Sequence, residues 1–308
     1  MSHIHPNLKL PVSSPRTLGS LLCSAALLLA GGCAGRPETP IIQLSSGTAA
    51  AATTSARLDA LLPADVLLLG EQHDAKEHQQ IEQQVIADLA ARGLLAALAL
   101  EMADTRLSTA ALKPSATEQQ TRDALKWNDK GWKWEAYGPA VMTAVRAGVP
   151  VLGANLPRTE LQASMADSTL DVLLPGPALK TQQQGIRIGH CNMLPESQIA
   201  PMARIQIAMD ITLANTLSQA AFPGKVVVLL TGSGHADRLL GVPQHLRADL
   251  KTKSVRLLAA NAHGDEPTAA FDSIWPTPAV PEVDYCAGLK EQLAPTAKPK
   301  PAGATTPN

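Results

Sequence analysis

Short apolar runs alternate along the chain with stretches in which apolar residues recur every three to four positions. The runs predict buried strands over residues 65–69, 95–100, 149–154, 225–230 and 255–259. The helical spacing predicts helices over residues 77–92, 117–127, 139–147 and 196–218. Strands that alternate with helices are typical of an α/β fold with a mostly parallel central sheet and helices on both faces. The less regular residues 156–187 predict a helical insertion.

Polar side chains gather where three of these strands end. Glu71 and His73 follow the first strand, Glu101 follows the second, and His235 follows the strand over 225–230. Ligands of open α/β sheets bind just beyond the carboxyl ends of the strands. These four side chains therefore define a candidate site.

Two chemistries and one alternative without chemistry suit these residues. Imidazoles and carboxylates bind divalent metals such as zinc, manganese or iron, and the candidate metal ligands are Glu71, His73, His190 and His235. A metal-dependent hydrolase would use Glu71, His73, Glu101 and His235 as catalytic residues, because an uncoordinated carboxylate can act as general base on metal-bound water. The alternative is a buried hydrogen-bond network that caps the strand ends.

Aromatic residues are concentrated in one segment, residues 127–139, which holds three of the four tryptophans and one of the two tyrosines. Trp132, Trp134 and Tyr137 can form an aromatic wall for a flat apolar ligand, or anchor a long loop on the sheet. Asn155 and Arg158 follow the strand over 149–154. They can orient a carboxylate, or Arg158 can form a salt bridge at a helix entry.

The first 32 residues have the features of an export signal. Residues 18–30 are apolar, follow basic residues and are too few for a membrane span, which needs about 20. Small residues precede Cys33, a pattern similar to the lipobox of bacterial lipoproteins, so we expect Cys33 to be lipidated. Ala34 stands where aspartate would signal inner-membrane retention. The sequence thus predicts a lipid-anchored protein of the outer membrane, facing the periplasm or the cell surface.

The remaining chain divides into three parts. Residues 33–54 are rich in Pro, Ser, Thr, Gly and Ala and predict a flexible tether, residues 55–290 form one domain, and residues 291–308 form a disordered tail. Cys191 and Cys286 remain after export. In an oxidising compartment this even pair favours a disulfide, with two separate buried thiols as the alternative. The net charge is −1 without a basic stripe, which argues against nucleic acid as a partner.

Taken in order, the motifs resemble the ChaN-like haem-binding lipoproteins of the Tiki/TraB/erythromycin-esterase superfamily. The shared segments span residues 58–286: Leu69–His73 with Glu101, Trp132–Trp134 with Tyr137 and Pro139, Ala154–Arg158, His190–Cys191, Gln206 with Asp210, Gly232–His235, and Gly241–Pro243. The resemblance implies an envelope lipoprotein that binds haem or handles iron during uptake. It leaves the hydrolase and a non-catalytic lipoprotein scaffold as alternatives.

For this family a tyrosinate is the expected haem ligand, and the chain has only Tyr137 and Tyr285. The resemblance therefore gives haem as the leading cofactor, with a divalent metal as the alternative. The implied haem-binding residues are Tyr137, Trp132, Trp134, Tyr285, Asn155 and Arg158. Haem or another small ligand and the membrane are the expected partners. Haem can also bridge two copies of the chain into a homodimer.

We predict that Cys33→Ala releases the protein from the membrane fraction, because the variant lacks the thiol that would carry the lipid. Fractionation of cells that express the full chain measures this, with Cys23→Ala as the matched control. A Cys33→Ala variant that stays with membranes as completely as the wild type would contradict the anchor.

Overall fold

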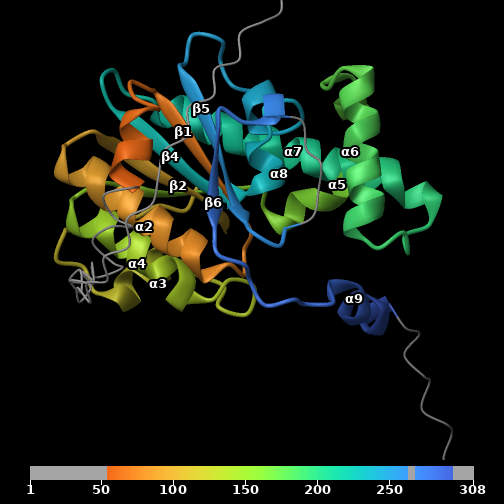
Figure 1. Ribbon diagram of the computed structural model, residues 1–308, viewed down its shortest axis with the longest axis horizontal. Helices are drawn as coiled ribbons and strands as arrows, with labels where there is room; N and C mark the ends of the chain where they lie inside the picture. Colours follow the sequence, from red (N-terminus) through yellow and green to blue (C-terminus); the bar gives the residue numbers. More distant parts are fainter. Residues whose placement is uncertain (1–53, 263–267, 294–308) are drawn as a thin grey trace, which may run out of the picture. The chain divides into compact units, whose positions relative to one another are not determined.

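The computed structural model of the chain describes residues 54–262 and 268–293 (Figure 1). The predicted signal peptide, Cys33 and nearly all of the predicted tether lie outside these residues. The same holds for the predicted tail beyond residue 293. Within residues 54–262 and 268–293, no helix is long and apolar enough to cross a membrane.

The described residues form a six-stranded sheet with the strand order β3-β2-β4-β1-β5-β6. The strands are β1 (Val66–Glu71), β2 (Leu95–Asp104), β3 (Val151–Asn155), β4 (Val226–Gly232), β5 (Thr252–Ala259) and β6 (Ser273–Thr277). Each pairing between these strands is parallel, which confirms the predicted fold class. All of them therefore end at the same edge of the sheet.

Helices cover both faces of the sheet, as predicted. On one side lie α2 (Lys76–Ala91), α3 (Glu118–Ala124) and α4 (Trp134–Arg146). On the other lies α7 (Glu196–Ala220), against which α5 (Leu161–Ala166) and α6 (Gly176–Gly189) pack. The short helix α8 (Ser233–Ala236) follows β4, and α9 (Tyr285–Leu293) ends inside the predicted tail.

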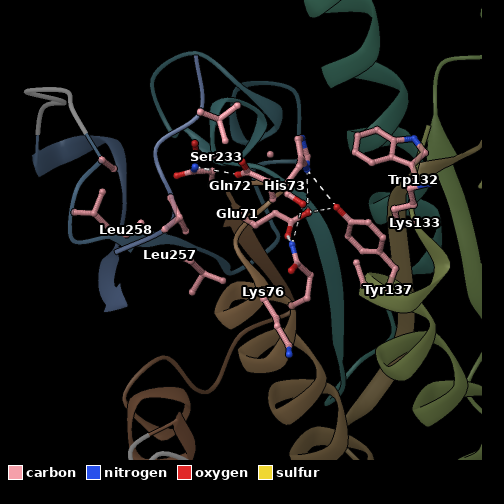
Figure 2. A pocket seen from close by; sticks show the side chains of 18 of the residues that line it. Glu71, Gln72, His73, Lys76, Trp132, Lys133, Tyr137, Ser233, Leu257 and Leu258 are labelled. Carbon is pink, nitrogen blue, oxygen red and sulfur yellow. Dashed lines mark hydrogen bonds and ion pairs between the residues drawn. The ribbon is translucent and has the colours of Figure 1, made fainter. Parts of the chain in front are cut away.

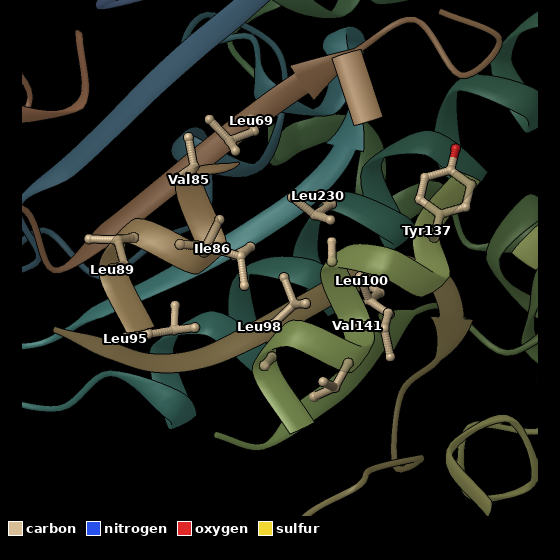
Figure 3. Packing of buried hydrophobic residues seen from close by; sticks show 14 of the residues in the cluster. Leu69, Val85, Ile86, Leu89, Leu95, Leu98, Leu100, Tyr137, Val141 and Leu230 are labelled. Carbon is tan, nitrogen blue, oxygen red and sulfur yellow. The ribbon is translucent and has the colours of Figure 1, made fainter. Parts of the chain in front are cut away.

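The core follows from the alternation of side chains along the strands. Leu67 and Leu69 of β1 pack with apolar residues of α2 and α4, whereas Val66 and Leu68 pack with those of α7. Figure 3 shows part of the first of these clusters, to which Tyr137 of α4 belongs together with aliphatic side chains of the strands and of α2. Because both faces of β1 are buried, the strand reads as a continuous apolar run in the sequence.

Several element bounds differ from the prediction; β2, for example, extends to Asp104 and β5 begins at Thr252. Two of the differences have a clear physical reason. The helix predicted over residues 139–147 begins earlier, at Trp134, so Pro139 lies inside α4 rather than in its first turn. Strand β6 was missed because it contains Pro276, which cannot donate to a ladder and is typical of an edge strand. The predicted insertion over residues 156–187 is helical, formed by short turns, α5 and most of α6.

A close approach of two strands fixes one glycine. Gly153 of β3 lies beside a bulge of β2, and a Cβ atom added there would stand 2.1 Å from the backbone oxygen of Asp104.

We predict that Gly153→Ala lowers the free energy of unfolding by about 1–3 kcal/mol, measured by urea denaturation, because the strands must move apart. The matched control is Gly185→Ala in α6, where an added Cβ meets no atom within 4 Å. Equal stability of Gly153→Ala and wild type would refute this packing.

Candidate functional site

A cavity of about 1720 Å³ opens at the carboxyl edge of the sheet. Its walls come from the ends of β1, β4 and β5, the first turns of α2 and α4, and residues 280–285 (Figure 2). It exceeds the roughly 300–1,000 Å³ that is usual for a site that binds a small drug-sized ligand. The titratable and aromatic side chains on its walls include Glu71, His73, Glu101, Trp132, Tyr137, His235 and Tyr285.

Glu71, the last residue of β1, is the centre of one hydrogen-bond cluster (Figure 2). The Tyr137 hydroxyl donates to Glu71 Oε1 over 2.6 Å, and His73 Nδ1 lies 2.9 Å from the same oxygen. Gln79 Nε2 donates to Oε2 over 2.7 Å. Charge-assisted bonds of this kind allow a carboxylate to be buried. Since protein donors occupy both oxygens, Glu71 orients His73 and Tyr137.

A further buried carboxyl belongs to Glu82 of α2. Glu82 of α2 is 1% exposed, and neither of its oxygens has a hydrogen-bond partner among the described residues. Burial, and then the charge of Glu71, raise the pKa of Glu82 well above its ordinary value. Burial without a partner therefore favours the neutral form of Glu82.

Glu101 of β2 lies just after the point where this strand stops pairing with β4. Thr231 Oγ1 and the Gly232 N–H donate to Glu101 Oε2 over 2.7 and 2.8 Å. The other oxygen, Oε1, is 4.0 Å from His73 Nε2 and 3.7 Å from His235 Nε2. Burial alone would raise the pKa of Glu101, but the two imidazoles and these hydrogen bonds outweigh it and lower that pKa. Glu101 is thus a carboxylate that both histidines share.

His235 forms a buried ion pair with Asp210, which projects from the middle of α7. His235 Nδ1 is 2.6 Å from Asp210 Oδ1, and the Gln206 amide nitrogen is within 3.1 Å of both ring nitrogens. Burial lowers the pKa of His235, but the charges of Asp210 and Glu101 outweigh it and raise the pKa to about 9. Burial raises the pKa of Asp210 to about 6, against the opposing effect of His235. Near pH 7 both partners are charged.

His73 is the more accessible of the two histidines, with 40% of its side chain exposed. Its ring packs edge-on against Trp132, with 4.8 Å between the ring centroids. Burial lowers the pKa of His73, but the hydrogen bond to Glu71 and the neighbouring carboxylates raise it overall. Gly232 makes room for this ring, because a Cβ atom there would stand 2.9 Å from His73 Nε2.

The aromatic segment divides between the cavity and the core. Trp132 is half-buried and lines the cavity, and Tyr137 reaches it although only 2% of the residue is exposed. Trp134 is 5% exposed, packs edge-on against Trp127 and is absent from the cavity wall. Because Trp134 begins α4 and faces the core, it does not form the aromatic wall predicted for it.

Three other predicted site residues lie away from the cavity. His190 follows α6, and its Nδ1 is 2.8 Å from the Ile186 carbonyl oxygen. Arg158 is exposed at the start of a 3-10 turn. Asn155 Nδ2 donates to the Glu101 carbonyl oxygen over 2.8 Å, so Asn155 supports the end of β2 instead of touching a ligand.

The predicted metal set is not assembled. Across residues 54–262 and 268–293, no group of three or more His, Cys, Asp or Glu side chains is arranged to hold a metal ion. His190 does not line the cavity and is bonded to the Ile186 carbonyl. Glu71 is bonded to three protein donors. The strand-end residues instead form the two hydrogen-bond clusters described above.

Part of the cavity wall comes from the C-terminal part of the chain. Cys191 and Cys286 form the expected disulfide, with 5.8 Å between their Cα atoms. Next to Cys286, Tyr285 is 58% exposed, lines the cavity and donates from its hydroxyl to Asp74. This hydrogen bond and burial raise the pKa of Tyr285 above its ordinary value. The cavity therefore has an accessible phenol on its wall, bonded to Asp74, the residue that follows His73.

The sequence interpretation missed Gln79 and gave Asp210 no role. Both are buried polar residues on helix faces that are otherwise apolar, Gln79 on α2 and Asp210 on α7. A polar residue in an apolar helical stripe was the available signal for each of them, because a buried polar group requires a hydrogen-bond partner.

The chain matches, over residues 57–246, the protein family described as "Haem-binding uptake, Tiki superfamily, ChaN", and it belongs to this family. Among solved structures it is similar to ChaN of Campylobacter jejuni with cofacially bound haem. The two share 26% identity over 71% of this chain and 90% of that chain, with a TM-score of 0.61. No curated protein shows a significant match.

More distant similarities were also found. They are the type III effector HopBA1, with 14% identity and a TM-score of 0.44, and a mutant of the erythromycin esterase EreC in its open conformation, with 13% identity and a TM-score of 0.41. They cover 74% and 70% of this chain, and 94% and 77% of those chains. At these scores neither likeness carries a functional argument, and the hydrolase alternative gains no support from them.

The ion pair gives a pH-dependent prediction. The pKa of His235 in the fold, about 9, lies above the ordinary 6.5, so protonation of the ring contributes its full stabilisation below pH 6.5 while Asp210 remains ionised; Asp210 itself becomes protonated below about pH 6. This stabilisation is lost as the pH rises through about 9. We predict that Asp210→Asn lowers the pKa of His235, measured by NMR titration of the ring. Asp249→Asn, at an exposed pair with Arg247, is the matched control. A His235 pKa near 6.5 in the wild type would contradict the ion pair.

Proposed function

We propose that this chain binds haem in the cavity at the carboxyl edge of the sheet. The observation that carries the proposal is the large cavity with an accessible phenol, Tyr285, on its wall. The family's description, haem-binding uptake, and the cofacial haem of the Campylobacter jejuni relative support the same ligand. Haem, when bound, would supply an iron that accepts oxygen or nitrogen donors of the protein.

Of the two tyrosines, Tyr285 suits an iron ligand better than Tyr137. The Tyr137 hydroxyl is buried and donates to Glu71, and burial and the neighbouring carboxylates raise the pKa of Tyr137 strongly. Tyr285 is exposed, and the acceptor of its proton, Asp74, is an exposed carboxylate. When the phenol binds a cation, Asp74 Oδ2 can take up the proton.

Other residues of the cavity wall provide contacts for a flat macrocycle. Trp132 offers an aromatic surface, and His73 offers an accessible imidazole held by Glu71. Lys76 and Lys133 also line the cavity and can pair with carboxylate groups of the ligand. These residues are the ones that would hold haem in this chain.

We extend the proposal to the setting of this binding. The signal-like N-terminus and Cys33 support a lipid-anchored protein of the outer membrane that takes part in haem or iron uptake. The cofacial haem of the relative supports a haem-bridged homodimer of this chain. Both statements rest on the sequence pattern and on the relative.

The test is a titration of the purified protein with haemin, followed by the absorbance of the Soret band. We predict saturable binding and at least a tenfold weaker affinity for Tyr285→Phe, because that variant loses the exposed oxygen. Tyr137→Phe is the matched control and should bind with nearly wild-type affinity. Wild-type protein without saturable binding, or with stoichiometric zinc, manganese or iron that His73→Ala loses, would overturn the proposal.

A further inference from the structure

Residues 280–285 line the cavity, and together with Cys286 we term them the C-terminal strap. The strap is attached to the rest of the fold mainly at its two ends. At the first end, the Val280 N–H donates to Asn261 Oδ1 over 3.0 Å, and Asn261 Nδ2 donates to the Val280 carbonyl over 2.8 Å. At the second end, Cys286 is bound to Cys191. Residues 281–286 are all exposed. Their position therefore depends on these two attachments and on the hydrogen bonds of Tyr285 with Asp74 and Gln72.

The other half of the disulfide belongs to a well-held part of the fold. Cys191 lies in the tight turn between α6 and α7, where both Cys191 and Asn192 have positive φ angles of 55° and 56°. The N–H groups of these two residues donate to carbonyls of the last turn of α6. Helix α6 packs on α7, the helix that supplies Asp210 to the site. The disulfide thus ties the strap to the scaffold of the site.

We propose that Cys191 and Cys286 are positioning residues of the ligand site, and that reduction of their disulfide releases Tyr285 from the cavity wall. The inference rests on the proposed haem binding and adds a redox condition to it. In the reduction, a dithiol gives two electrons and two protons to the Cys191–Cys286 bond, which becomes two thiols while the dithiol becomes a disulfide.

The effect on affinity follows from the population of the binding-competent strap. If the released strap places Tyr285 at the wall about one tenth of the time, the apparent affinity falls about tenfold. The loss arises through Tyr285, so a chain that already lacks the phenolic oxygen should be insensitive to the disulfide. The disulfide and the hydroxyl should therefore be non-additive.

A double-mutant cycle tests this with haemin as the probe. The four proteins are wild type, Cys191→Ser/Cys286→Ser, Tyr285→Phe, and the combination of all three changes. We expect the double serine variant to bind haemin about tenfold more weakly than the wild type. The combination of all three changes should bind haemin no more weakly than Tyr285→Phe alone. Dithiothreitol should weaken the wild type to the level of the double serine variant and leave that variant unchanged.

A second measurement needs no haem. The N–H groups of Tyr285 and Ala287 donate to the Val283 carbonyl and to Asp284 Oδ1, and their hydrogen exchange should accelerate at least tenfold in the double serine variant, while β1 and β4 keep their protection. Asp74→Asn, which weakens the Tyr285 contact but keeps the disulfide, should give a smaller increase.

The outcomes separate the inference from the proposed function. Saturable haemin binding that is equal in the oxidised and reduced protein, or fully additive losses in the cycle, overturns the positioning role and leaves haem binding intact. Unchanged exchange of the strap also overturns it. Absence of saturable binding in all four proteins overturns the proposed function, and the positioning role with it.

Discussion

The site depends on the burial of carboxylates at the ends of parallel strands. Moving an ion of this size out of water costs several kcal/mol even after the protein relaxes, unless hydrogen bonds and opposite charges replace the solvent. Glu71 and Glu101 obtain these partners from different elements: α2 and α4 supply donors to Glu71, and β4 supplies donors to Glu101. Satisfying the two carboxylates thus fixes how these elements meet at the sheet edge.

The same bonds shape the cavity. Because Tyr137 and Gln79 reach Glu71 from the first turns of α4 and α2, both helices begin at the rim of the cavity. His78, next to Gln79, accepts from the Gln72 N–H and bonds Thr277 of β6, which ties the rim to the edge strand. This hydrogen-bonded network therefore forms the base of the cavity, from which the exposed His73 and the half-buried Trp132 project.

Much of this arrangement could be predicted from the sequence, because apolar runs and helical spacing report burial directly. The convergence of Glu71, His73, Glu101 and His235 followed from the rule that parallel strands end together. The roles of Trp134, His190 and Arg158 could not be predicted in this way. They depend on where a helix starts and how an insertion folds back, which tertiary packing decides. The family resemblance names Tyr285, but its contact with Asp74 beside the disulfide-bonded Cys286 has no local sequence pattern.

We propose that haem occupies the cavity that Tyr285, His73 and Trp132 line. Anomalous scattering at the iron edge, from crystals of the haemin-loaded chain, locates the metal most directly. We predict one iron position per chain inside the cavity, within bonding distance of the Tyr285 oxygen. An iron position outside the cavity, or one bound only by residues away from the carboxyl edge of the sheet, would contradict it.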